Sequence, residues 1–226
     1  MKPLLITIDG PAGAGKTTVS RALADHLAYT YVDTGALYRA VALAAKEAGI
    51  STTDDEGLEA LSRRLSLEFV QTEAGTRLLL NGVDITDRIR TPEISMEASR
   101  VSARPVIRTY LLDLQRRLGK GKRVVFEGRD MGTVVFPDAD IKFYLHADLK
   151  TRAARRFEES RGGSAAQDLH TVEKEMNFRD RQDSRRDIAP LKPAQDAVII
   201  DSTAMSIEEV VGCILLHIRQ KFGKTP

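Results

Sequence analysis

The stretch IDGPAGAGKTT, at residues 8–18, has a residue spacing suited to binding phosphate. Gly10 is separated by four residues from Gly15, Lys16 and Thr17, which is the Walker A pattern. Glycine permits the backbone conformations in which successive N–H groups converge on phosphate oxygens. Lys16 is expected to contact the β- and γ-phosphates, and Thr17 to hold Mg²⁺ directly or through water. The pattern predicts a site for ATP lined by Gly10, Pro11, Ala12, Gly13, Ala14, Gly15, Lys16, Thr17 and Thr18.

A phosphate-binding loop alone serves switches, motors and kinases, so other motifs must decide between them. A GTPase should carry an Asn-Lys-x-Asp guanine reader, but the chain has two asparagines, Asn81 and Asn177, and neither precedes a lysine. A nucleic-acid motor should show a basic stripe. The most arginine-rich stretch, 148–187, holds ten Lys/Arg and nine Asp/Glu, a balance of +1. The sequence therefore favours transfer of phosphate to a small acceptor and indicates no nucleic-acid partner.

The same stretch contains two sets of charged residues at helical spacings of three and four. They are Arg152, Arg155 and Arg156, and then Arg179, Asp183 and Arg186. Arginine forks stabilise charge on a transferring phosphoryl group. Because a small, polar loop from Arg161 to Gln167 separates the two predicted helices, we expect them to form a mobile lid over ATP. The alternative is a solvated surface with salt bridges.

Two further segments place charged side chains just after predicted strands. The segment EGRDMGTVVFP (127–137) carries Arg129 and Asp130, and DTGALYR (33–39) carries Arg39. Ligands of open α/β sheets bind at the carboxyl ends of the strands. These residues are therefore candidates for an active site, although a local ion pair in a turn would also explain Arg129 and Asp130.

The elements that must position these residues alternate between strand and helix. Apolar runs at 4–8, 30–35, 123–128, 141–147 and 197–201 predict strands, and the segments between them contain helical patterns. This alternation predicts an α/β fold of the P-loop NTPase type, with a five-stranded parallel sheet flanked by helices. Short β-type runs and an Asn81-Gly82 turn predict a small antiparallel insert at about 64–92.

The composition of the chain narrows the class of protein and its location. The 226 residues carry a formal charge of +2, with 42% apolar and 29% charged residues, which is typical of a globular protein. No apolar run approaches the ~20 residues that span a membrane. The one cysteine, Cys213, cannot form an internal disulfide, and the N-terminal apolar run is too short for a signal peptide. We expect a cytoplasmic protein with no membrane partner.

Several of these segments, taken together, closely resemble the bacterial cytidylate kinases of the nucleoside monophosphate kinase superfamily. The resemblance covers nearly the whole chain through ITIDGPAGAGKTT, DTGALYR, IRTPEI, EGRDMGTVVFPDA, RDRQDSRR followed by APL, and IIDSTAMSIEEV. It implies Mg²⁺- and ATP-dependent phosphorylation of CMP and dCMP by a monomer. It also implies a core (1–35, 104–150 and 188–226), a monophosphate-binding subdomain (36–103, including the β insert) and a lid (151–187).

The resemblance also implies roles at matching positions. Lys16, Arg129, Asp130 and Arg186 correspond to catalytic positions, and Arg39, Arg129 and Arg186 to ligands of the acceptor phosphate. Ser99, Arg108 and Asp130 correspond to cytosine contacts, and Arg179 and Asp183 to ribose contacts. Thr34 belongs to the substrate segment. Thr17 departs from the family, which often has glycine there, and this affects how Mg²⁺ is held.

Two other functions remain open from the residues. A P-loop kinase for another acceptor, such as UMP or shikimate, would share the same loop. A nucleotide-dependent interaction protein would bind ATP without transferring phosphate to any monophosphate. A panel of acceptors distinguishes all three.

Overall fold

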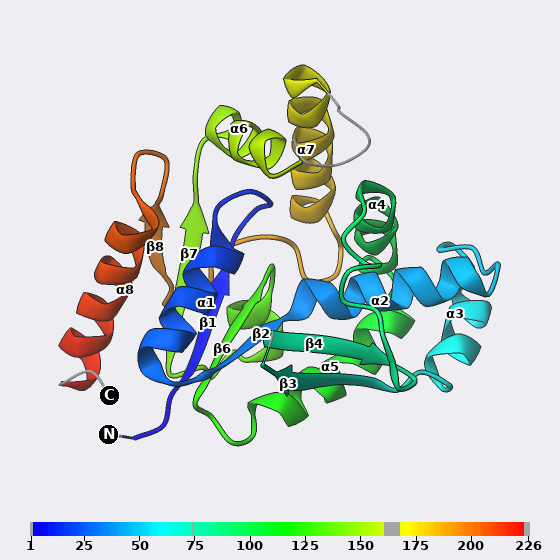
Figure 1. The fold of residues 1–226 in the computed structure, drawn as a ribbon, viewed down its shortest axis with the longest axis horizontal. Coiled ribbons are helices and arrows are strands. Elements are labelled where there is room, and N and C mark those ends of the chain that lie inside the picture. Colours follow the sequence, from blue (N-terminus) through cyan, green and yellow to red (C-terminus); the bar gives the residue numbers. More distant parts are fainter. Residues whose placement is uncertain (1, 74, 161–167, 224–226) are drawn as a thin grey trace. The chain divides into compact units, whose positions relative to one another are not determined.

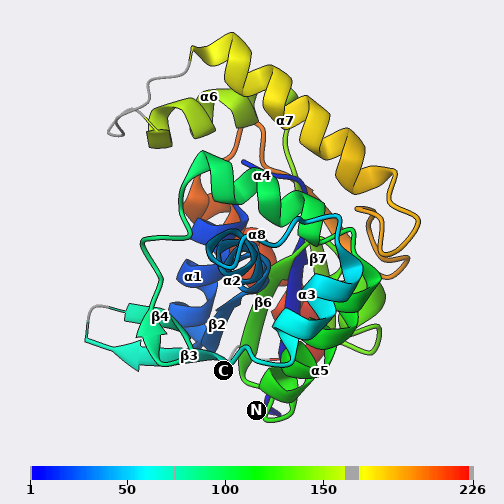
Figure 2. The same ribbon diagram turned by 90° about the vertical axis from the view of Figure 1, so that its right-hand side faces the viewer.

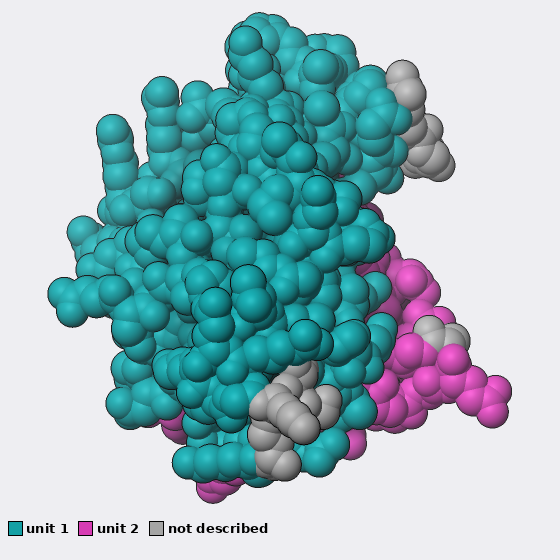
Figure 3. Space-filling view, turned by 90° about the vertical axis from the view of Figure 1, so that its left-hand side faces the viewer, with its two compact units in different colours: residues 1–32, 121–226 teal, residues 33–120 magenta. Residues whose placement is uncertain are grey.

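The computed structural model describes residues 2–73, 75–160 and 168–223. The chain forms two compact units, Met1–Val32 with Gly121–Pro226 (unit 1) and Asp33–Lys120 (unit 2), which are coloured separately in Figure 3. The loop expected at 161–167 lies outside the described residues. The three subdomains expected from the sequence are functional divisions and remain a prediction.

Unit 1 is built on a sheet whose described strands run in the order β2-β6-β1-β7-β8 (Figure 1). Their bounds are β1 Leu5–Asp9, β2 Thr30–Asp33, β6 Val124–Gly128, β7 Ile141–His146 and β8 Val198–Asp201. The central strand β1 pairs in parallel with both β6 and β7. All five residues of β1 are buried, as expected for a parallel strand covered on both faces. The predicted five-stranded parallel sheet is confirmed.

Helices α1 (Lys16–Leu27) and α8 (Ile207–Phe222) pack against each other and against this sheet. Their buried apolar residues, such as Leu23 and Ile214, share one hydrophobic cluster with the strand residues Ile6 and Phe143. A capping box fixes the start of α8, because Ser206 and Glu209 satisfy each other's backbone N–H groups. Among the described residues, no helix has both the length and the apolar character needed to cross a membrane.

Helices α6 (Leu149–Ser160) and α7 (Leu169–Ser184) follow β7 and lie side by side (Figures 1 and 2). A small apolar cluster of Ala153, Val172 and Met176 joins them, and Ala12 of the phosphate-binding loop packs against it. The helical spacing of Arg179, Asp183 and Arg186 predicted that all three residues lie on the second charged helix. This helix ends at Ser184, so Arg186 lies beyond it.

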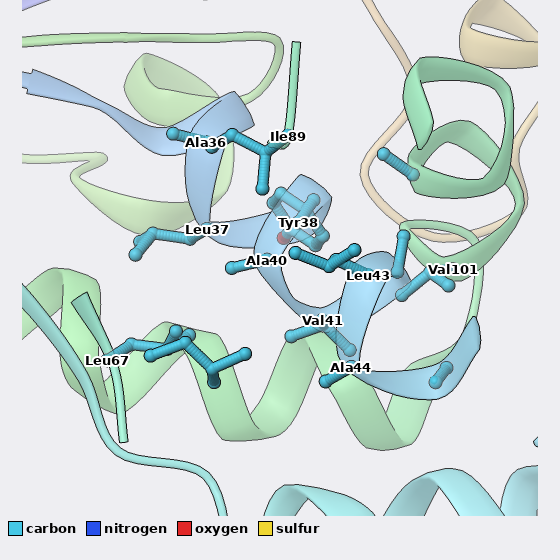
Figure 4. Close-up of a cluster of buried hydrophobic side chains, with 14 of the residues drawn as sticks. Ala36, Leu37, Tyr38, Ala40, Val41, Leu43, Ala44, Leu67, Ile89 and Val101 are labelled. Carbon is cyan, nitrogen blue, oxygen red and sulfur yellow. The ribbon is translucent and has the colours of Figure 1, made fainter. Parts of the chain in front are cut away.

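Unit 2 contains helices α2 (Thr34–Glu47), α3 (Asp55–Ser62), α4 (Pro92–Val101) and α5 (Pro105–Gly119). Its small antiparallel sheet has the order β3-β4-β5 in the described chain, with β3 Leu67–Thr72, β4 Gly75–Leu80 and β5 Val83–Asp84. Asn81 and Gly82 both adopt positive φ, as a tight hairpin turn requires. Figure 4 shows the apolar core of this unit, with Leu37, Val41 and Leu43 of α2 pointing into it.

Candidate active site

The phosphate-binding loop connects β1 to α1 and depends on its glycines. Gly10 has φ 148°, and a Cβ there would lie 1.9 Å from the Leu145 carbonyl oxygen. Gly13 has φ 72°, and a Cβ there would lie 2.9 Å from the Arg152 carbonyl oxygen. Helix α1 starts at Lys16 after Gly15, so its positive end points into the loop. The loop is therefore shaped as an anion cradle, as the sequence predicted.

Lys16 is buried inside this loop, with 5% of its surface exposed. Its Nζ donates a hydrogen bond of 2.7 Å to the Pro11 carbonyl. Burial, together with the nearby charges of Arg129 and Arg179, lowers the pKa of Lys16 to about 7, although Glu127 opposes the shift. A buried cation with a depressed pKa is poised to gain stability from an anion.

Glu127 is a residue of the site that the sequence prediction missed. It lies near the end of β6, beside Ile8 of β1, and is buried. The Thr17 hydroxyl donates to Glu127 Oε1 at 2.9 Å, and the Tyr31 hydroxyl donates to Oε2 at 2.8 Å. A hydroxyl that donates to a carboxylate presents its oxygen lone pairs outward, and hard cations bind such oxygen sets. The only sequence signal was the glutamate preceding Gly128 at the end of a strand.

Asp9 is a second missed residue, at the last position of β1. Its carboxylate accepts hydrogen bonds from the backbone N–H groups of Met131 and Gly132, at 2.9 and 2.7 Å. Burial raises the pKa of Asp9 to about 6 despite these two hydrogen bonds. The Asp9 carboxylate thus joins the start of the phosphate-binding loop to the segment after β6.

The segments that carry Arg129 and Arg186 meet at one buried carboxylate. Asp183 has 1% of its side chain exposed, accepts from Arg129 Nε at 3.2 Å, and pairs with Arg186. Burial alone would raise the pKa of Asp183, but the charges of Arg129, Arg186 and Arg179 outweigh it and hold the pKa below its usual range. Unit 1 therefore gathers Arg129, Arg186 and Arg179 around Asp183, and the roles expected for these residues remain a prediction.

The three arginines of α6 have different surroundings. Arg152 is buried and donates to the Ala12 carbonyl at 3.0 Å and to Asp180 at 2.6 Å. Arg155 donates to the Ser202 carbonyl at 2.7 Å. Arg156 pairs with Glu159 and is 45% exposed. Helical spacing predicted one shared face, but only Arg152 touches the phosphate-binding loop through a described hydrogen bond.

In unit 2, Asp33 caps the start of α2 and positions Arg39. Its carboxylate accepts from the Ala36 N–H at 3.0 Å and from Arg39 Nη2 at 2.7 Å. Burial would raise the pKa of Asp33, but Arg39 leads the groups that hold it below its usual range. Thr34, buried, is the first residue of α2. The strand predicted at 30–35 ends at Asp33, because the Asp33 cap lets the helix begin directly after it.

The other predicted residues of unit 2 surround the junction between α4 and α5. Ser99 and Arg108 are both buried. Arg108 donates to the Ser102 carbonyl at 3.0 Å, and the Ser102 hydroxyl donates to the Ser99 carbonyl at 2.8 Å. The Arg108 guanidinium lies 5.7 Å from the centre of the Tyr38 ring, which is a cation–π contact. Unit 2 thus brings Ser99 and Arg108 to one buried junction.

A Walker A loop after the central strand of a parallel sheet, with arginine-bearing helices after a neighbouring strand, defines a P-loop kinase. Shikimate kinase from Acinetobacter baumannii in complex with shikimate shares this fold. It is 17% identical, with a TM-score of 0.50, and the alignment covers 99% of this chain and 97% of that one.

Sequence comparison narrows the class. The cytidylate kinase family model matches residues 6–220. A cytidylate kinase from Geobacter sulfurreducens is 47% identical over 99% of this chain and 96% of its own length. One from Syntrophotalea carbinolica is 46% identical over 97% of this chain and 94% of its own length. The chain belongs to the cytidylate kinase family.

Proposed function

We infer that this protein transfers the γ-phosphoryl group of ATP to CMP and dCMP, forming ADP and CDP or dCDP. The observation that carries the inference is the family match over residues 6–220, which includes the phosphate-binding loop and every predicted acceptor residue. In the transfer, a phosphate oxygen of CMP forms a bond to the γ-phosphorus as the bond to the bridging oxygen of ADP breaks. The protein's contribution is to position and stabilise charge.

On the donor side, the loop amides and Lys16 hold the phosphates of ATP. Lys16 already lies inside the loop, so it can exchange its bond to the Pro11 carbonyl for a phosphate oxygen. Thr17 and Glu127 provide a hydroxyl and a carboxylate 2.9 Å apart, a donor set that fits Mg²⁺. When bound, Mg²⁺ supplies positive charge against the phosphate oxygens.

For the acceptor, the family resemblance supports roles for Arg129, Arg186 and Arg39 at the CMP phosphate and for Arg179 and Asp183 at the ribose. It supports roles for Asp130, as an acceptor for the amino group of cytosine, and for Ser99 and Arg108 at the base. Thr34 belongs to the substrate segment. The charge types support these roles, because cytosine presents a donor at N4 and acceptors at N3 and O2.

A panel of acceptors tests the function. The purified protein is mixed with ATP, Mg²⁺ and CMP, dCMP, UMP, AMP or shikimate, and ADP release is followed by a coupled assay. We expect CMP and dCMP to give the highest kcat/KM. Preference for UMP or shikimate would overturn the acceptor assignment. ATP binding without ADP release on any acceptor would instead indicate a nucleotide-dependent interaction protein.

The monomeric state and the cytoplasmic location expected from the sequence belong to the same proposal. Family resemblance supports both. Light scattering on the protein eluting from a size-exclusion column would test the monomer, with a mass of 25.0 kDa as the expected result.

A further inference from the structure

The Asp9 carboxylate connects two segments that leave neighbouring strands at the same level. In the parallel register of β1 and β6, Asp9 lies opposite Gly128. The chain continues from Asp9 into the phosphate-binding loop, and from Gly128 into Arg129 and Asp130. Asp9 is 4% exposed, and each of its two oxygens accepts one backbone N–H, from Met131 and Gly132. The start of one segment is thereby tied to the end of the other.

The two amides that Asp9 binds are the first of a short π-helical segment, η1 (Met131–Val135). Such amides need an acceptor, which the preceding residue usually supplies. Asp130 is that residue, but its side chain makes no capping hydrogen bond within the described structure. Asp9 supplies both acceptors from another strand. The Asp130 carboxylate is therefore not used to cap its own helix.

Arg129 and Asp130 are thus held at both ends. Gly128 is fixed by strand pairing, and Met131 and Gly132 are fixed by Asp9. Close packing supports the second anchor. A Cβ on Gly132 would lie 3.1 Å from both Thr7 Oγ1 and Lys142 Cδ, so the segment passes close to β1 and β7. A two-residue segment between two fixed points has little freedom to reorient its side chains.

We propose that Asp9 is a positioning residue for the acceptor nucleotide, because its two hydrogen bonds hold the Arg129–Asp130 segment in the conformation that contacts CMP. This inference rests on the proposed function for one point, namely that the ligand of the Arg129–Asp130 segment is CMP. The proposal predicts that substitutions at Asp9 raise the KM for CMP more than the KM for ATP, although Asp9 directly precedes the phosphate-binding loop.

The charge on Asp9 provides a second test. Burial, with a smaller contribution from the charge of Asp130, raises the pKa of Asp9 to about 6, although the two amides and Lys16 oppose the rise. Burial raises the pKa of Tyr144 on β7, and the nearby charge of Asp9 contributes to that rise. As the pH falls through about 6, one oxygen gains a proton and becomes a poor acceptor for its amide. Binding of CMP should therefore weaken below this pH.

The experiment compares wild type with Asp9→Asn. Asparagine keeps the size of the side chain, but its NH₂ group would face one of the two amide donors. At pH 7.5 we expect the KM for CMP to rise by about tenfold or more, the equivalent of one lost hydrogen bond to a charged group. The KM for ATP should change by less than about threefold, and the CMP-to-UMP ratio of kcat/KM should fall. Without nucleotide, hydrogen exchange at Met131 and Gly132 should accelerate.

Asp140→Asn is the matched control. Asp140 accepts the Leu5 N–H at 2.8 Å at the opposite end of β1 and pairs with Lys122. This variant should lower the unfolding temperature without a selective change in the KM for CMP. Near pH 5.5 the KM values of wild type and Asp9→Asn should converge. The CMP phosphate, with a second pKa of about 6, titrates equally in both proteins.

A folded Asp9→Asn protein with a CMP KM within twofold of wild type would overturn the proposal. Equal rises in the CMP and ATP KM values would do the same. If Asp9→Asn does not fold, hydrogen exchange in the wild-type protein decides. At pH values below 6, the protection of the Met131 and Gly132 amides must decrease while the protein as a whole stays folded. Hydrogen exchange also separates the positioning role of Asp9 from the proposed function. A wild-type protein that is inactive on every acceptor would refute the function. The exchange rates at Met131 and Gly132 would still decide whether Asp9 fixes this segment.

Discussion

Replacing Asp183 by asparagine should destabilise the folded protein by about 3 kcal/mol, because this carboxylate is shared by two guanidinium groups. Its side chain is 1% exposed, and its partners Arg129 and Arg186 are 20% and 8% exposed. Breaking a buried ion pair by neutralising one partner costs about 3–5 kcal/mol. We take the lower end because the asparagine oxygen can still accept from one arginine. For a chain of this size, the melting temperature should fall by roughly 6–12 °C.

The assay is urea unfolding followed by circular dichroism, with Asp180→Asn as the matched control. Asp180 lies one turn earlier on α7 and pairs with Arg152 at 2.6 Å. Arg152 also donates to the Ala12 and Ala147 carbonyls, so it keeps acceptors when Asp180 is neutralised. We therefore expect Asp180→Asn to lose only about 1 kcal/mol, as one hydrogen bond contributes.

The direction in which the stabilising contribution of Asp183 changes with pH also follows from its pKa. The pKa of Asp183 is lower in the folded state than its ordinary value of about 3.9. Its stabilising contribution is therefore complete above the ordinary value and is lost as the pH falls through the lower, folded one. The stability difference between wild type and Asp183→Asn should be constant above about pH 5 and shrink below about pH 4. A loss below about 1 kcal/mol, or a difference unchanged at pH 3, would refute the reasoning.

Four further predictions concern the nucleotides. Lys16→Ala should fold but lose most transfer activity in the coupled assay, because a charge beside the transferring group is removed; near wild-type turnover would contradict the assignment. At pH 8, ATP binding should take up protons in wild type but not in Lys16→Ala, as measured calorimetrically in two buffers, because phosphate raises a lysine pKa that begins at about 7. Asp130→Asn should lower kcat/KM for CMP at least about tenfold and narrow the gap to UMP, and an unchanged ratio would mean that Asp130 does not contact the base. An ATP–CMP bisubstrate analogue should slow hydrogen exchange in α6 and α7, and unchanged exchange would count against a lid there.

The sequence predicted the elements of the fold well because their signals are local. The Walker A pattern, the five apolar runs and the Asn81-Gly82 turn each depend on a few consecutive residues, and all three features appear in the structure. Element boundaries were less certain. The start of α2 at Thr34 depends on the Asp33 side chain accepting the Ala36 N–H, which outweighs the turn character of Thr-Gly.

The missed site residues have long-range partners. Glu127 accepts from Thr17, 110 positions away, and Asp9 accepts from Met131, 122 positions away. A single carboxylate at the end of an apolar strand carries no local sign that it is buried and paired. Helical spacing likewise showed that Arg152, Arg155 and Arg156 are close in space, but not which element each would contact. Those contacts depend on how β1, α6 and α7 pack together.

The buried carboxylates of unit 1 explain how its cations can be held ready for nucleotides. Burying a charge is unfavourable unless a counter-charge or hydrogen bonds compensate it. Asp183 compensates Arg129 and Arg186, and Glu127 partly offsets the fall in the pKa of Lys16. Lys16 remains undercompensated, since its pKa is still lowered to about 7. The positive charge of Lys16 is therefore only partly compensated by the protein. The phosphates of ATP, bound in the same loop, can provide the missing negative charge.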